Sequence, residues 1–201
     1  SEMCIRDRAY VITSKLGDHL PLYRRENIFA RQGVEIARST MCAWMRAAGD
    51  LVVPLVELLA SRVKQSQVIH TDDTPVPIQS PGAKQCRKGR IWCYVGDAAH
   101  PYVAYDYTPS RARAGPAERA MKRVAIGRKN WPGTRASGSA GNDAAAQNHA
   151  RLWSLIASCE RHGVDPQRYL TSVFAKIGQL PRDAADQIPV AELVQLLPDV
   201  W

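Results

Sequence analysis

The chain has 201 residues, of which 45% are hydrophobic and 23% are charged, and these fractions are those of a globular protein. No stretch approaches 18 consecutive apolar residues, and the N-terminus lacks the layout of a secretory signal, so we expect a cytoplasmic protein without a membrane segment. The net charge of +8 favours a polyanionic partner such as nucleic acid; the alternative is simply a basic, soluble surface.

The N-terminal third of the chain has a helical pattern. Residues 1–8 show no period and match nothing that follows, so we interpret them as an extraneous segment. Residues 9–66 form the predicted N-terminal helical region, with one apolar stripe ending near Gly33. A second helix is expected to begin with Ser39 as its N-cap, and a third apolar run covers residues 51–63.

Four arginines lie close to the turn between the first two of these helices. They are Arg24, Arg25, Arg31 and Arg38. A helical pair with a short turn could be a helix-turn-helix, whose second helix enters the DNA major groove. The alternative is an ordinary helical hairpin with solvated arginines, and because such hairpins are common the sequence favours it.

After residue 66 the pattern changes to period two and β-branched residues. It predicts three short strands over residues 67–71, 91–95 and 102–107, with a loop over residues 77–88. Connections of this length indicate an antiparallel meander. The first strand is expected to end at Asp72, which would hold its carboxylate at the edge of the sheet.

No further strand is predicted after Tyr107. Residues 132–143 are rich in Gly, Ser and Ala and predict a flexible linker. Residues 144–201 predict a helical tail, with helices over residues 144–162, from Pro166 to about Ile177, and over residues 190–197. The predicted fold class is α+β, and the sequence leaves open whether the tail packs on the sheet.

The strongest local signal for chemistry is His-Thr-Asp-Asp-Thr-Pro at residues 70–75. Mg²⁺ prefers oxygen ligands, and two such ions about 3.5–4 Å apart can activate the attacking oxygen and stabilise the leaving one in phosphodiester chemistry. The alternative is that Asp72 and Asp73 form a turn or cap the next segment, and the residues alone favour this alternative.

Two further groups of residues could bind a ligand. Residues 122–131 interleave Lys and Arg with Trp131, a pattern that could follow a phosphate backbone and stack a base, or form a solvated loop. Cys86, Cys93 and His100 lack the spacing and the fourth ligand of a zinc site. The five cysteines are an odd number without framework spacing, which indicates reduced thiols.

Several stretches, in order along the chain, resemble landmarks of transposases of the insertion-sequence-66 family. These stretches are residues 18–24, 28–34, 39–40, 70–77, 89–95, 118–121, 127–131, 154–156 and 163–166. The similarity covers nearly all of residues 10–201, and ordered motifs are far more specific than any single one. The resemblance implies a ribonuclease-H-like catalytic core over residues 67–131, truncated to about three antiparallel strands and flanked by the N-terminal helices and the C-terminal helical tail.

The resemblance also implies the roles of particular residues. Asp72 would be the first metal-binding aspartate and Glu118 the final catalytic glutamate, together holding Mg²⁺ or Mn²⁺. The residues implied to lie near the DNA backbone are Arg119, Arg123, Arg128 and Lys129. The implied activity is phosphodiester cleavage followed by strand transfer, with transposon ends and target DNA as partners, and a homo-oligomer is compatible with it.

One departure from the family pattern outweighs the others. The family's second aspartate lies in an Asp-Gly-Tyr stretch at the end of a fourth strand, and this sequence has no such stretch. Only ten residues separate Tyr107 from Glu118, whereas a helical crossover alone needs a dozen or more. Neither Asp97, at the wrong edge of the sheet, nor Asp106, roughly 9.5 Å from Asp72 across two strands, is expected to replace it.

We therefore interpret the chain as an internally truncated transposase with impaired catalysis. One alternative is a DNA-binding remnant without catalysis. The other is a decayed gene product that does not fold stably, because a sheet without its fourth strand is expected to leave one edge open and one face poorly covered.

Overall fold

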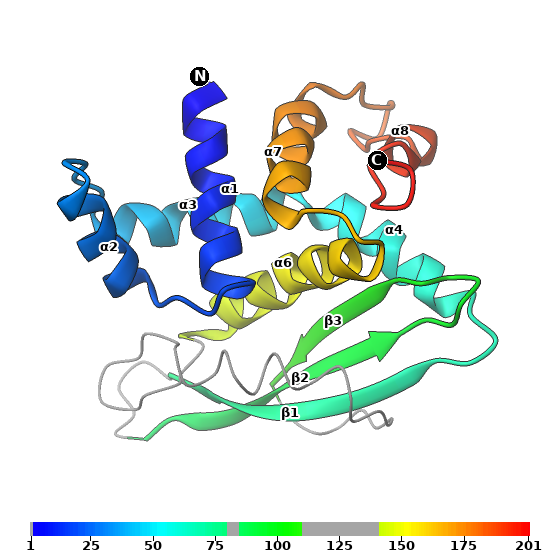
Figure 1. The fold of residues 1–201 in the computed structure, drawn as a ribbon. Helices are drawn as coiled ribbons and strands as arrows, with labels where there is room; N and C mark the ends of the chain where they lie inside the picture. Colours follow the sequence, from blue (N-terminus) through cyan, green and yellow to red (C-terminus); the bar gives the residue numbers. More distant parts are fainter. Residues whose placement is uncertain (1, 80–84, 110–140) are drawn as a thin grey trace.

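A layer of helices packs on one face of a three-stranded sheet (Figure 1). The computed structural model describes residues 2–79, 85–109 and 141–201. The helices before the sheet are α1 (Glu2–Leu16), α2 (Leu22–Arg31), α3 (Arg38–Leu51) and α4 (Val53–Lys64). Those after it are α6 (Asp143–Arg161), α7 (Pro166–Lys176), the 3-10 turn η1 (Ile177–Gln179) and α8 (Val190–Val194). The α+β class is confirmed.

Helix α1 runs without a break from Glu2 to Leu16, so its first turns consist of residues that we interpreted as extraneous. Within this helix Ala9 and Ile12 are fully buried in the common core. The guanidinium carbon of Arg8 lies 5.9 Å from the ring centroid of Trp44 on α3. Among the described residues, no helix has both the length and the apolar character that crossing a bilayer requires.

The beginning of α3 corrects one prediction. The helix begins at Arg38, its N-cap is Ala37, and no side chain caps it, so the prediction of Ser39 as the N-cap is wrong. The Arg38 backbone N–H and guanidinium instead contact the Glu26 carboxylate of α2, with an ion-pair distance of 3.2 Å. This contact replaces a helix cap because it satisfies the first backbone donor of α3 and links the two helices.

The arginine cluster between α2 and α3 is partly structural. Arg25 is only 2% exposed, its guanidinium carbon lies 3.8 Å from the Tyr10 ring centroid, and it donates a hydrogen bond of 2.8 Å to the Tyr10 hydroxyl. Arg25 packs inside the protein, whereas Arg24, Arg31 and Arg38 are exposed, and Arg38 is ion-paired with Glu26.

The three strands pair antiparallel in the order β1-β2-β3, which confirms the predicted meander. They are β1 (His70–Ile78), β2 (Arg87–Val95) and β3 (Val103–Thr108). The predicted bounds of the first strand were wrong: it begins at His70 and continues through residues that we assigned to a loop. Pro75 and Pro77 are the source of this error, since proline usually interrupts strands but is tolerated on an edge strand where its missing N–H faces away from the ladder.

The side chains of the sheet divide into two rows by alternation. The row that faces the helices includes the buried Thr74, Val76 and Ile78 of β1. Helix α6 lies along β3 on this side (Figure 1), and the rings of Tyr105 and Trp153 lie 6.2 Å apart between them. The C-terminal helices therefore share one core with the sheet and with α1, α3 and α4.

The outer edge of β3 is covered by two serines of α6. Ser158 Oγ accepts a hydrogen bond from the Val103 N–H at 3.0 Å and donates to the Val103 carbonyl at 3.1 Å. Ser154 Oγ accepts from the Tyr105 N–H at 2.8 Å. Serines four residues apart lie on one face of a helix, so their hydroxyls act in place of a neighbouring strand.

The outer edge of β1 has fewer available backbone N–H groups for a different reason. The Asp73 N–H donates to the Asp72 carboxylate at 2.7 Å, Pro75 and Pro77 have no N–H, and the Gln79 N–H donates to the Gly141 carbonyl at 2.8 Å. Among the described residues no strand pairs with this edge, and these features reduce the number of its N–H groups that could pair with one.

Candidate functional site

Asp72, the predicted first metal ligand, lies within β1 rather than after its end. The register places it opposite Cys93 of β2 and in the same cross-strand row as Tyr105 of β3. Its side chain is half-buried on the face toward the helices, and its Oδ1 accepts the Asp73 N–H at 2.7 Å. This carboxylate therefore lies within the strand and not at its end, where we predicted it.

Asp73 points to the opposite face of the sheet. It is directly opposite Trp92, and its carboxylate forms an ion pair with Arg90 of β2. Trp92 is only 2% exposed and donates its indole N–H to Thr108 Oγ1 at 2.8 Å. Because neighbouring residues of a strand alternate in direction, Asp72 and Asp73 cannot share one ion without a local change in the strand.

The neighbourhood of Asp72 is poorly suited to thiolate chemistry. Cys93 is fully buried, and this burial raises the pKa of its thiol to about 12, with a hydrogen bond to Tyr105 opposing the shift and the negative charge of Asp72 adding to it. The thiol is therefore protonated at neutral pH. It lies beside the carboxylate as a small apolar group.

Asp97 and Asp106 are engaged elsewhere. Asp97 follows β2 at the end of the sheet where β1 begins. Because Asp72 lies near the beginning of β1 and not at its end, Asp97 is at the same end of the sheet as Asp72, which corrects our reason for excluding it. The Asp97 carboxylate accepts the N–H groups of Gln67, Ala99 and His100. Burial raises the pKa of Asp97, but these hydrogen bonds and the His100 side chain outweigh it, so that its pKa is below the usual value. It stabilises the connections around the sheet.

Asp106 lies in the row of Trp92 and Asp73, two strands from β1. It therefore faces away from Asp72, and its Oδ1 accepts the Tyr107 N–H at 2.8 Å. Asp106 and Asp72 are therefore separated by two strands, as we expected from the sequence, and they also lie on opposite faces of the sheet.

The described residues do not form a complete site for a divalent ion. Within residues 2–79, 85–109 and 141–201, no three His, Cys, Asp or Glu side chains lie close enough together to hold a metal. Of the two predicted metal ligands, Asp72 and Glu118, only Asp72 is among these described residues. Glu118, Arg119, Arg123, Arg128 and Lys129 all lie outside the described residues.

Sequence reasoning missed Arg90 as the partner of Asp73. The signal was present in the alternation of Lys88, Arg90 and Trp92, which share one face of β2. It could not be used because the predicted second strand began only at residue 91 and the register between the strands was not known.

Comparison with protein families decides the assignment. The family model described as Transposase IS66 family matches residues 5–116, and the model described as IS66 C-terminal element matches residues 154–198. The chain belongs to the IS66 transposase family. The first match begins within the segment that we interpreted as extraneous, and Glu118 with its neighbouring cations falls between the two matches.

The relatives of this IS66-family chain are considerably longer than the chain itself. The protein named "Uncharacterized protein y4qI" of Sinorhizobium fredii (strain NBRC 101917 / NGR234) is 37% identical over 109 residues, which are 51% of this chain and 20% of the relative. The protein named "Uncharacterized protein y4jD" of the same strain is 31% identical over 119 residues, or 56% of this chain and 23% of the relative. The chain thus spans about a fifth of these relatives. No solved structure matches it.

Proposed function

We propose that this chain derives from a metal-dependent DNA transposase with a ribonuclease-H-like core, and that it binds DNA without cleaving it efficiently. Family membership supports the transposition function. Asp72 and Glu118 would hold Mg²⁺ or Mn²⁺ in the intact family, where the metal would activate the attacking oxygen in phosphodiester cleavage. In this chain the second aspartate is missing, and the metal site is incomplete without it.

The position of β1 is the observation that carries this proposal. Asp72 lies on β1, and among the described residues no fourth strand pairs with β1 on the side away from β2. The ten residues between Tyr107 and Glu118 are too few for a crossover helix and a further strand. No other described carboxylate lies in the row of Asp72 on its side of the sheet.

We expect no strand cleavage by this chain above background. The measurement is a nicking assay with Mg²⁺ or Mn²⁺ on DNA that carries the terminal sequence of an IS66-family element. A full-length IS66-family transposase serves as the positive control. Metal-dependent nicking that Asp72→Ala abolishes would contradict the proposal, because it would mean that a working metal site forms without the second aspartate.

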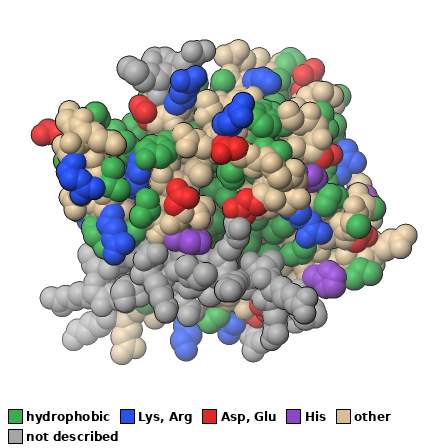
Figure 2. All heavy atoms as spheres, viewed as in Figure 1, with side chains coloured by type: hydrophobic (Ala, Val, Ile, Leu, Met, Phe, Trp, Pro, Cys, Tyr) green, Lys and Arg blue, Asp and Glu red, His purple; other side chains and the backbone are tan. Residues whose placement is uncertain are grey.

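The support for DNA binding is electrostatic and concentrated in one part of the sequence. Residues 110–140 contain eight Lys and Arg and one acidic residue, so seven of the eight net positive charges lie in that segment. Elsewhere the cations are interspersed with acidic side chains, as the face in Figure 2 illustrates. Binding to the DNA backbone should therefore depend on this basic segment.

We expect a quadruple variant, with glutamine at Arg119, Arg123, Arg128 and Lys129, to lose most of its DNA affinity, by about 100-fold at low salt. The slope of log affinity against log salt should decrease by about 3–4, since each lost phosphate contact contributes about 0.9. Fluorescence anisotropy with a labelled duplex measures both quantities. The control has glutamine at four exposed cations of the described helices, Arg24, Arg31, Lys64 and Lys176, and equal losses in both variants would contradict the assignment.

A further inference from the structure

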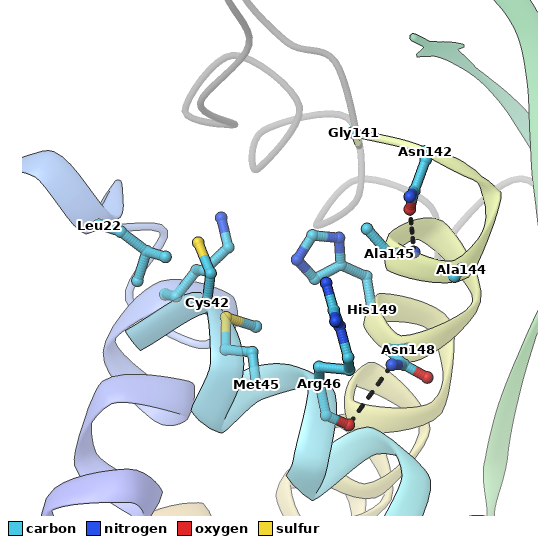
Figure 3. Close-up of a pocket in the computed structure, with 11 residues that line it drawn as sticks. Leu22, Cys42, Met45, Arg46, Gly141, Asn142, Ala144, Ala145, Asn148 and His149 are labelled. Atoms are coloured by element: carbon cyan, nitrogen blue, oxygen red, sulfur yellow. Dashed lines mark hydrogen bonds between the residues drawn. The ribbon is translucent and has the colours of Figure 1, made fainter. Parts of the chain in front are cut away.

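A cavity of about 460 Å³ lies between α3, the end of α1 and the beginning of α6 (Figure 3). Leu22 and Met45 provide an apolar wall, whereas Lys15, Arg46 and His149 provide nitrogen groups. The lining contains no Asp or Glu side chain among the described residues. The volume is within the range of small-molecule sites, and the lining is cationic.

Lys15 is the unusual member of this lining. The residue is only 5% exposed, and its ammonium group has no hydrogen-bond partner among the described residues. Burial lowers the pKa of Lys15 to about 8, with Cys42 opposing the shift, so the group is still mostly protonated at neutral pH. A buried cation without a counter-charge is costly, and an anion in the cavity would remove that cost.

Two further features of the cavity favour an anion. Arg46, on α3, is exposed at the rim and points into the cavity in Figure 3. At the beginning of the 19-residue helix α6, the N-cap Asn142 and the helix residues Ala144 and Ala145 form part of the wall, whereas Asp143 is ion-paired with Arg87 and does not line it. The N-terminal end of a helix carries partial positive charge and attracts anions.

His149 adds a polar group without adding charge. It points into the cavity from α6 (Figure 3), and its pKa is lowered to about 3 by burial and, to a lesser extent, by the charge of Lys15. It is therefore neutral at pH 7 and can take part in hydrogen bonds to a ligand.

We propose that this cavity binds a phosphate group, either inorganic phosphate or the terminal phosphate of a nucleotide or DNA strand. The Lys15 ammonium and the Arg46 guanidinium would contact its oxygens, and the beginning of α6 would add its partial charge. A phosphate dianion matches two full cations and a helix end better than a singly charged carboxylate does. This site lies on helices rather than on the strand of Asp72, and it is independent of the DNA binding proposed for the basic segment.

The test is isothermal titration of the whole chain with potassium phosphate, against potassium chloride of equal ionic strength. We expect saturable phosphate binding, which Lys15→Met weakens by about 10–100-fold and the rim variant Arg46→Gln weakens less. Lys64→Met, at an exposed position of α4, should bind like the unmodified chain. Lys15→Met removes a buried charge that has no hydrogen-bond partner among the described residues, so its melting temperature without phosphate should be equal or higher, which separates lost binding from misfolding.

Further titrations distinguish the sources of the phosphate. They compare adenosine 5′-monophosphate with adenosine, and 5′-phosphorylated with 5′-hydroxyl oligonucleotides. Lys15-dependent binding of inorganic phosphate and of all monoesters would support a general phosphate site, whereas binding of the phosphorylated oligonucleotide alone would support a DNA end as the occupant. Absence of binding by every phosphate compound, or equal binding by the Lys15→Met and unmodified chains, would overturn the proposal.

Discussion

Alanine at both Ser154 and Ser158 is expected to lower the free energy of unfolding by about 2–5 kcal/mol, because each change leaves buried backbone groups of β3 without a partner. The Val103 and Tyr105 N–H groups donate to these two hydroxyls, and both contacts are buried. Water cannot replace the lost hydroxyls there without opening the contact between α6 and β3. The loss therefore exceeds that of two exposed hydrogen bonds.

Urea denaturation followed by circular dichroism measures this loss. Ser61→Ala is the matched control, since the Ser61 hydroxyl bonds to the Leu58 carbonyl at an exposed position of α4 and should contribute little. If the double variant and the control have the same unfolding midpoint, α6 does not serve as the partner of the β3 edge. Single variants at Ser154 and Ser158 would then show whether either contact matters.

Gly96→Ala is expected to destabilise the protein by about 3 kcal/mol, at the upper end of the usual cost of overpacking. A Cβ at this position would lie 2.1 Å from the His100 carbonyl oxygen and 2.8 Å from Ser66 Oγ. The turn cannot easily move away, because the Gly96 N–H donates to the Tyr102 carbonyl at 3.0 Å and the Gly96 carbonyl accepts from Arg161 at 3.0 Å.

Gly178→Ala provides the control for this substitution. Gly178 lies in η1, no atom lies within 4 Å of the position that its Cβ would take, and its backbone does not require glycine. The control should be neutral or slightly stabilising, because alanine reduces the freedom of the unfolded chain. Melting temperatures of the two variants, measured side by side, compare these effects. A neutral Gly96→Ala would mean that the turn between β2 and β3 is looser than its contacts indicate.

The two edges of the three described strands bear on the stability of the sheet. One edge is bonded to α6 through serine hydroxyls, and the other contains two prolines and a carboxylate that bonds to its neighbour's N–H. The face toward the helices is covered by α4 and α6. These features oppose strand-to-strand aggregation, and they count against an unstable sheet.

The helices after the sheet and the order of the strands could be predicted from residue patterns alone. Apolar spacing predicted α6 and α7 to within a residue or two, and Asp165 caps α7 by accepting the Arg168 N–H at 2.7 Å. Short connections predicted the antiparallel meander. The ordered motifs also indicated the family correctly, because several matches in sequence order do not require knowledge of the fold.

The bounds of β1 and the directions of its carboxylates depended on the tertiary structure. Proline weakened the strand pattern, and only the pairing with β2 shows that Asp72 and Asp73 face opposite sides. The cavity around Lys15 also had no sequence signal, because its lining residues come from α1, α3 and α6, which are more than a hundred positions apart at the extremes. Local patterns report which face of an element is apolar, whereas register and packing across distant segments determine which polar groups meet.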